Sequence, residues 1–151
     1  MKNKKKADWL DWLLRIAIVL GIIGTFYFSY SPAKNYVTAK QEEAKIEEVS
    51  KKVVENTNDY PDVKEIKKST NEDVVGWIRV PGTNIDEPIL QTTDNDYYLN
   101  HSLTKEELDV GSIFLDAKAN SNYDNNFNFV FGHNTYIDNK FTQLRKFSDP
   151  E

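Results

Sequence analysis

The sequence contains no cysteine. Disulfide bonds, thiolate metal sites and a cysteine nucleophile are therefore excluded for this chain. A basic stripe is also lacking beyond the first 30 residues. Residues 1–30 carry a net charge of +3, whereas residues 31–151 hold 14 basic and 22 acidic groups and a net charge of −8. This acidic remainder argues against nucleic acid as a partner. The length of 151 residues suits one modest domain.

Charged residues are absent from Ile16 to Ala33, a run of 18 residues that are mostly aliphatic or aromatic. As a helix this run is roughly 27 Å long, about the thickness of one hydrocarbon core. Trp9 and Trp12 lie at one end and Tyr27 and Tyr30 at the other. Aromatic residues are enriched at both membrane interfaces, so the pattern predicts a transmembrane helix.

Lysines at positions 2, 4, 5 and 6 precede the apolar run. They predict a single-pass anchor in the cell membrane, with the N-terminus in the cytoplasm and residues after ~31 outside. A cleaved signal peptide is the rival interpretation, because residues 29–31 form a small-x-small triplet. Pro32 follows that triplet, and the run exceeds the ~7–15 residues of a typical signal peptide, which favours an uncleaved anchor. A helix in a soluble core fits less well, because the run is apolar on every side.

Residues 33–56 contain no glycine and only helix-compatible residues, rich in lysine, glutamate and alanine. Ile46, Val49 and Val53 recur on one helical face. We expect a helical stalk that lifts a domain off the membrane and docks on it. Residues 56–61 break the stalk, and a short second helix follows. The predicted organisation is a cytoplasmic N-terminus and anchor at 1–31, a helical stalk at 32–70 and a β-rich body at 71–151.

Four strands are expected in the body, at 77–80, 85–91, 111–116 and 127–131. Pro88 places the second of them at an edge or a bulge. The body is therefore mostly β with short helices, a pattern that favours a β-barrel or a sandwich. Four strands cannot close a barrel without leaving two unpaired edges, so residues 71–151 are expected to be an incomplete domain.

Short helical elements are expected between and after these strands. Residues 94–99 suggest a capped helical turn, and Thr104 to Glu107 fit a capping box. Asp138 or Asn139 is expected to cap a last helix that turns three apolar side chains inward. These side chains are Phe141, Leu144 and Phe147.

His133 is the candidate site residue. Phe127, Phe129 and Phe131 alternate with other residues and predict a strand with one strongly apolar face. The strand runs into Gly132, which permits a turn and a close approach, and then into His133. Histidine has an ordinary pKa near ~6.5, which suits proton transfer. The plainer interpretation is a polar residue that ends a strand.

The second histidine, His101, follows Asn100 in a turn and could approach His133. A surface or hydrogen-bonded role is favoured over a metal or catalytic one, because the sequence shows no convergent ligands. The Asn-rich stretch 119–126 lacks the glycine and closing glutamate of a calcium loop. No cofactor and no metal ion are predicted.

Several motifs occur in an order that resembles the class B sortases. Gly76–Gln91 is similar to the first hairpin of that family, and Asp94–His101 to its "DNxYYL" helix. Gly111–Asp116 resembles the next strand. Phe131–Asn134 is similar to the "YGHN" end of the histidine strand, and Phe141–Leu144 to the "MFxxL" helix that follows. The resemblance covers residues 71–151, and the anchor and helical stalk fit it too.

The resemblance implies a fold and an activity. Sortases are membrane-anchored cysteine transpeptidases of Gram-positive bacteria, built on a closed eight-stranded β-barrel. They cleave a surface protein at a sorting signal after threonine and hold it as a thioester. They then pass it to an amine on a cell-wall precursor or a pilin. A histidine, a cysteine and an arginine carry this chemistry. His133 matches the family histidine, the general acid for the leaving amine and later the base for the incoming one.

The chain departs from the family pattern because the cysteine, in a "TLxTC" motif, and the later arginine are not in it. Arg79 and Arg145 lie in other segments and do not match. We therefore expect this polypeptide alone to be inactive as a transpeptidase. Three interpretations remain open: a truncated class B sortase, one half of a split enzyme whose second chain carries the cysteine, and a non-enzymatic membrane-anchored binding module.

Overall fold

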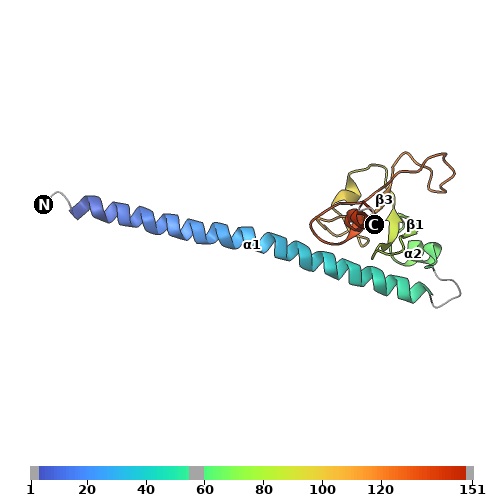
Figure 1. Cartoon of the computed structure of the whole chain (residues 1–151), viewed down its shortest axis with the longest axis horizontal. Coiled ribbons are helices and arrows are strands. Elements are labelled where there is room, and N and C mark those ends of the chain that lie inside the picture. The colour runs from blue at the N-terminus through green and yellow to red at the C-terminus, as the bar shows by residue number, and fades with distance from the viewer. Residues whose placement is uncertain (1–3, 55–59, 149–151) are drawn as a thin grey trace. The chain divides into compact units, whose positions relative to one another are not determined.

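The computed structural model describes residues 4–54 and 60–148, and two compact units, Met1–Tyr36 and Val37–Glu151, divide the chain. One helix, α1 (Lys4–Val54), contributes to both units (Figure 1). It passes through Pro32 without ending. The sequence predicted a transmembrane helix followed by a separate stalk helix. An internal proline removes only one backbone hydrogen bond, and the flanking residues favour helix, so the two predicted helices are continuous.

In the first unit, α1 exposes its apolar side chains. Phe26, Tyr27 and Phe28 keep 74%, 76% and 82% of their surface in contact with solvent. The helix from Trp9 to Lys51 contains an 18-residue window with a mean hydropathy of 1.8, none of which is buried. Its length and composition are sufficient to cross a membrane, as the sequence predicted.

The later turns of α1 form part of the body. Ala39, Glu42 and Ile46 are buried, and Val49 packs on the core cluster that contains Ile46, whereas Ala39 packs in a smaller cluster with Leu108, Val110 and Ile137. The spacing of the four α1 residues places them on one face of the helix. Ile46 and Val49 therefore confirm the predicted apolar stripe, whereas the side chain of Val53 lies outside the described part. The stalk docks by entering the main hydrophobic core.

Glu42, which is buried on this face of α1, is expected to make the folding stability depend on pH. Burial raises the pKa of its carboxyl, opposed by a hydrogen bond from the Leu103 N–H and by the charges of Lys140 and Lys45, while Glu87 adds to the rise. The native state then binds this proton more tightly than the unfolded chain. Its contribution to stability is therefore present below the ordinary pKa of 4.5 and is lost as the pH rises through the raised folded value.

We expect Glu42→Gln to remove this loss, because the amide stays neutral and its oxygen still accepts the Leu103 N–H. The measurement is the free energy of urea unfolding between about pH 4 and pH 8, where a buried carboxyl titrates. The free energy of unfolding of the variant should increase relative to that of the wild type as the pH rises. Glu47→Gln, at an exposed position of the same helix, is the control. Parallel curves for wild type and Glu42→Gln would contradict the prediction.

A short helix, α2 (Val63–Ser69), leads into the sheet. The Asp62 side chain accepts a hydrogen bond from the Lys64 N–H and caps its start. Ile66 is fully buried against the core that Ile46 enters. The predicted second helix is confirmed.

The sheet has four strands in the order β1-β2-β3-β4. The first two, β1 (Val74–Arg79) and β2 (Asp86–Leu90), pair antiparallel with a bulge between Val74 and Gly76. Asp86 accepts hydrogen bonds from the side chains of Trp77 and Arg79, at 2.6 and 3.0 Å, which link the two strands near the turn of the hairpin. This hairpin confirms the first two predicted strands.

Pro88 lies in β2 opposite Trp77. It is in an inner strand, yet β2 pairs with β3 (Phe114–Leu115) only at Leu90, and in parallel. The proline therefore interrupts no ladder bond to β3, which accounts for its tolerance in the sheet. The bulge lies on β1 and not at the proline.

The last strand, β4 (Val130–Phe131), pairs antiparallel with β3. Both strands are shorter than the predicted 111–116 and 127–131. The predicted apolar face of 127–131 is also not buried: Phe127, Phe129 and Phe131 are 80%, 61% and 40% exposed. A strand can pair only along the length of its neighbour. Because β3 has two residues, β4 pairs over two residues as well. The described strands form an open sheet and no closed barrel.

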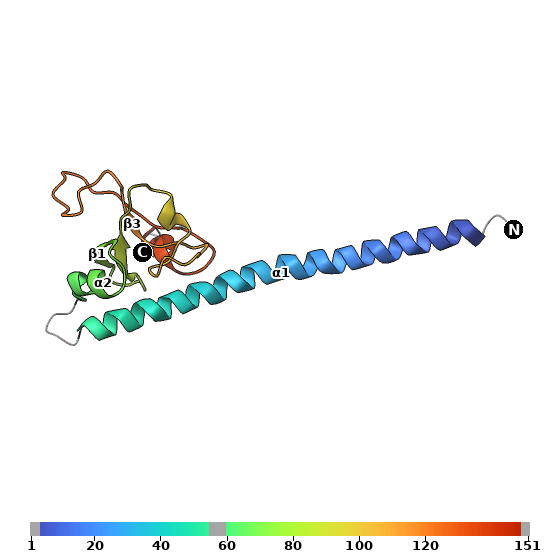
Figure 2. The same cartoon turned by 180° about the vertical axis from the view of Figure 1, so that it is seen from behind.

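Two loops shape the rest of the body. The Asn-rich loop 119–126 projects from the strands in both views, in orange (Figures 1 and 2). The predicted capping box at Thr104–Glu107 is wrong, because no helix forms there. Instead the Ser102 hydroxyl accepts from the backbone N–H groups of Thr104 and Glu106, and Lys105 has a φ of 64°. A hydroxyl that accepts backbone N–H groups, as a helix cap does, therefore stabilises a turn here and not a helix.

The final element is a 3₁₀ helix, η2 (Lys140–Phe147), which begins after Asn139. Its buried residues are Lys140, Thr142 and Gln143. The prediction that Phe141, Leu144 and Phe147 face inward is wrong for the last two, which are 39% and 62% exposed, while Phe141 packs partly on the core. A helix with three residues per turn presents a different face from the α-helix assumed from the sequence.

Candidate active site

His133 follows β4 directly and is held there from two sides. Its backbone carbonyl accepts a hydrogen bond from the Phe141 N–H at 3.1 Å. A Cβ added at Gly132 would lie 2.9 Å from the Phe141 ring and 3.3 Å from Ile113. Glycine is therefore required for η2 and β4 to approach this closely. The predicted role of Gly132 in a close approach is confirmed.

The imidazole of His133 is half-buried and hydrogen-bonds to one backbone carbonyl among the described residues. Its Nε2 lies 2.7 Å from the carbonyl oxygen of Leu99. A carbonyl only accepts, so Nε2 is the donor and carries a proton. The bond joins the end of β4 to residues 34 positions earlier in the chain.

Leu99 ends a short 3₁₀ helix, η1 (Tyr97–Leu99), which confirms the predicted helical turn. Asp94 starts the turn by accepting hydrogen bonds from the N–H groups of Asp96 and Tyr97 at 2.9 and 2.8 Å. Those bonds, the one from Tyr97 first, hold the pKa of the Asp94 carboxyl below its ordinary value.

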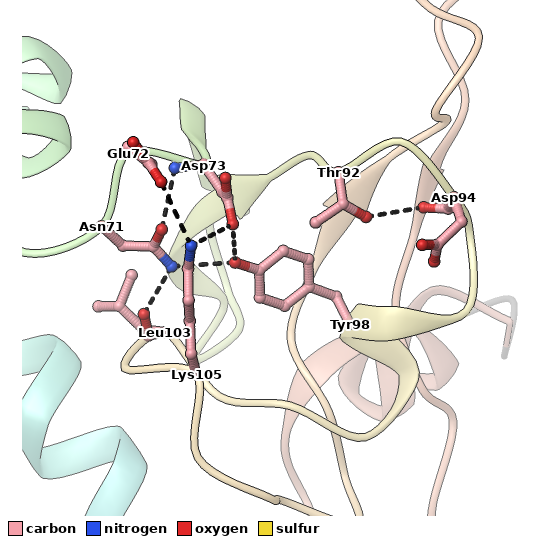
Figure 3. A network of polar contacts seen from close by, with 8 residues as sticks. All are labelled: Asn71, Glu72, Asp73, Thr92, Asp94, Tyr98, Leu103 and Lys105. Atoms are coloured by element: carbon pink, nitrogen blue, oxygen red, sulfur yellow. Dashed lines mark hydrogen bonds and ion pairs between the residues drawn. The ribbon is translucent and has the colours of Figure 1, made fainter.

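A polar network fixes the middle of η1 from the other side (Figure 3). The Tyr98 hydroxyl donates to Asp73 at 2.7 Å and accepts from the Asn71 amide at 3.0 Å. The Asn71 amide also donates to the Leu103 carbonyl, and Lys105 pairs with Asp73 at 2.9 Å. Burial raises the pKa of the Tyr98 hydroxyl, so it remains a neutral hydrogen-bond donor.

A hollow of about 540 Å³ opens beside His133. It is lined mainly by apolar side chains from η1, β3, β4 and η2. The lining residues are Asn95, Leu99, Phe114, Val130, Phe131, Gly132, His133 and Phe141. An apolar hollow with a polar, proton-carrying group at its edge is a typical binding site for part of a peptide or a small molecule.

His101 belongs to a different local structure. Its ring stacks on Tyr97, with centroids 4.0 Å apart, and its Nδ1 lies 2.7 Å from the Tyr97 carbonyl and 2.9 Å from the Asn100 side-chain oxygen. This is the hydrogen-bonded role that the sequence favoured. Arg79 contacts Asp86 and lies 4.6 Å above the Tyr60 ring, as part of the hairpin.

Metal ligands do not gather in the described ranges, 4–54 and 60–148: no three His, Asp or Glu side chains are placed to hold an ion. Sequence reasoning found His133 but missed the groups that hold it. The Leu99 carbonyl gives no sequence signal, because every residue has one. Gly111 could have been found as a glycine at the start of the predicted strand 111–116, where it permits a close approach of another backbone segment.

The fold is an open sheet on a helical stalk, and its candidate site is a histidine at the end of a strand, beside an apolar hollow. No family model matches the chain. It is 41% identical over 81 residues to sortase B of Listeria monocytogenes, covering 54% of this chain and 33% of the relative. It is 29% identical over 139 residues to sortase B of Staphylococcus aureus, covering 89% of this chain and 57% of the relative.

Among solved structures, sortase B of Bacillus anthracis in complex with AAEK1 matches with a TM-score of 0.66 and 29% identity. The match covers 77% of this chain and 56% of that structure. These likenesses identify the chain as a class B sortase homologue, in agreement with the motifs at 71–151. The chain spans between a third and somewhat more than half of the curated sortase B relatives it matches.

Proposed function

We propose that the chain supplies the proton-transferring histidine of a class B sortase-type transpeptidase. The observation that carries the proposal is the position of His133 at the end of β4, hydrogen-bonded to Leu99 and at the rim of the apolar hollow. The substrates implied by the family resemblance are a cell-wall-sorted surface protein and an amine on wall peptide or pilin. The apolar α1 anchors the chain in the cell membrane, with the body outside.

The reaction requires a thiolate that this chain lacks. In the family mechanism, the thiolate attacks the carbonyl of the threonine, and a thioester forms as the C–N bond after the threonine breaks. His133 gives a proton to the leaving amine. The incoming amine then attacks the thioester and gives its proton to His133, and the thiolate is released. Each transfer uses one proton on one imidazole, which suits histidine near neutral pH.

The chain alone is therefore expected to show no transpeptidation. The experiment incubates the full chain in detergent with a sorting-signal peptide and an amine acceptor, and measures cleavage by mass spectrometry. Turnover above the enzyme-free reaction would refute this expectation. A second reaction adds a polypeptide that carries the family's cysteine and arginine motifs. Cleavage in that mixture supports the split enzyme.

The role of His133 is tested in the same mixture. His133→Ala should return cleavage to the enzyme-free level, because no other described group at the hollow can carry the proton. His101→Ala, the matched histidine outside the hollow, should retain activity. Equal activity of both variants would contradict the assignment of His133. A folded chain that binds wall proteins and shows no activity in any mixture would support the binding module.

A further inference from the structure

The Leu99 carbonyl determines which nitrogen of His133 is protonated. Because the carbonyl can only accept, the 2.7 Å contact requires a hydrogen on Nε2. In the neutral ring, Nδ1 then carries the lone pair. Within residues 4–54 and 60–148, no group forms a hydrogen bond with this Nδ1. The ring is thus held at one nitrogen and open at the other.

The Leu99 carbonyl is itself held in place by its neighbours. The Tyr98 side chain is 1% exposed, and its hydroxyl is fixed by Asn71 and Asp73 (Figure 3). The Tyr98 carbonyl accepts from the Ser112 N–H at 2.9 Å. The Tyr98–Leu99 peptide is therefore anchored through both a side chain and the backbone.

Gly111 completes this support by packing directly on the two carbonyls. A Cβ added there would lie 2.4 Å from the carbonyl oxygens of both Tyr98 and Leu99. Gly111 also has a φ of 54°, in the left-handed region. Only glycine combines this conformation with so close a contact to backbone. Any side chain at this position must displace the acceptor of His133.

We propose that the Leu99 carbonyl is the positioning group for His133, and that Nδ1 is the atom that gives and takes the proton. The proposal rests on the transpeptidase function proposed above. Nδ1–H of the doubly protonated ring supplies the proton to the leaving amine, and Nδ1 receives one from the incoming amine. Nε2 keeps its hydrogen throughout, and its bond to the carbonyl becomes charge-assisted when the ring is protonated.

His101 provides an internal comparison with the opposite geometry. Its Nδ1 is 2.7 Å from the Tyr97 carbonyl, so Nδ1 carries the hydrogen and Nε2 the lone pair. The two histidines of one molecule are therefore expected to be opposite tautomers. This difference distinguishes a fixed ring from the intrinsic preference of histidine, which would act on both rings in the same direction.

The test is nitrogen NMR of the full chain in detergent micelles, with labelled histidine, at about pH 8.5, where an ordinary histidine is neutral. His133→Gln and His101→Gln assign the two sets of signals. The expected result is Nε2–H alone for His133, with a slowly exchanging ring proton, and Nδ1–H for His101. Nδ1–H at His133, or a mixture of both tautomers there, would overturn the proposal.

Gly111→Ala tests the support, with Gly82→Ala as its matched control. Gly82 also has a positive φ, 83°, but nothing lies within 4 Å of its added Cβ. Exchange of the His133 ring proton should be at least tenfold faster in Gly111→Ala and unchanged in Gly82→Ala. If Gly111→Ala does not fold, Tyr98→Phe replaces it, with an expected two- to threefold increase. Unchanged exchange in the folded variant would refute the positioning role.

These outcomes are separate from those of the transpeptidase test. A mixed tautomer with His133-dependent cleavage would refute the positioning group and leave the proposed function intact. A fixed tautomer without any cleavage in the two-chain mixture would support the positioning group and refute the proposed function.

Discussion

Replacing Lys140 with methionine is expected to lower the free energy of unfolding by about 3–5 kcal/mol. Lys140 begins η2 and pairs with Glu87 of β2, and their side chains are only 2% and 8% exposed. Methionine fills much of the same volume but leaves the Glu87 carboxylate buried without its cation. The loss therefore comes from an uncompensated charge more than from lost packing.

A double-mutant cycle tests this explanation by urea unfolding followed by circular dichroism. Adding Glu87→Gln to Lys140→Met removes the stranded charge and should recover at least half of the lost stability. Lys146→Met, at an exposed position on the same helix, should change stability by less than about 1 kcal/mol. If Lys140→Met also lowered the free energy of unfolding by less than about 1 kcal/mol, the Lys140–Glu87 pair would not be buried in solution.

Replacing Ile46 with alanine is expected to lower the free energy of unfolding by about 2–5 kcal/mol, although the residue lies in the stalk. Ile46 is 5% exposed and belongs to the cluster that contains Ile66, Leu90 and Phe114. The substitution leaves a cavity between α1 and the sheet. Alanine favours helix, so the loss cannot arise from helix propensity.

Val37→Ala is the control, because Val37 is 52% exposed in the same helix. It should leave stability within about 0.5 kcal/mol of the wild type. Unfolding is followed by the near-ultraviolet signal of the body. Equal effects of the two variants would show that the stalk only links the body to the anchor and does not help to fold it.

Local patterns predicted the elements whose structure is set locally. The second helix, the strands on either side of Pro81–Gly82 and the Asp94 turn depend on residues close in sequence, and all form as expected. The histidine at the end of β4 was found in the same way, because strand alternation and a following glycine are visible in one short stretch.

Predictions failed where a partner far away in the sequence decides the outcome. The period of η2 is set by Lys140 reaching Glu87 and Gln143 accepting the Asn84 N–H at 2.7 Å, so its buried face is polar. The Phe127 to Phe131 stretch alternates as a buried strand would, yet its burial needs a neighbour that the described residues do not provide. Alternation of apolar residues shows that one face of a strand could be buried, but it does not show whether another element covers that face.

We expect the outer edge of β4, the last strand in the sheet order, to limit solubility. The backbone on that side has no strand beside it in the described part of the chain, and the exposed Phe127 and Phe129 precede it in sequence. Such an edge recruits any extended segment that reaches it, including one from another copy. When the body is produced by itself, we therefore expect the yield to depend on concentration, because dilution keeps copies apart and a high concentration during synthesis favours aggregation.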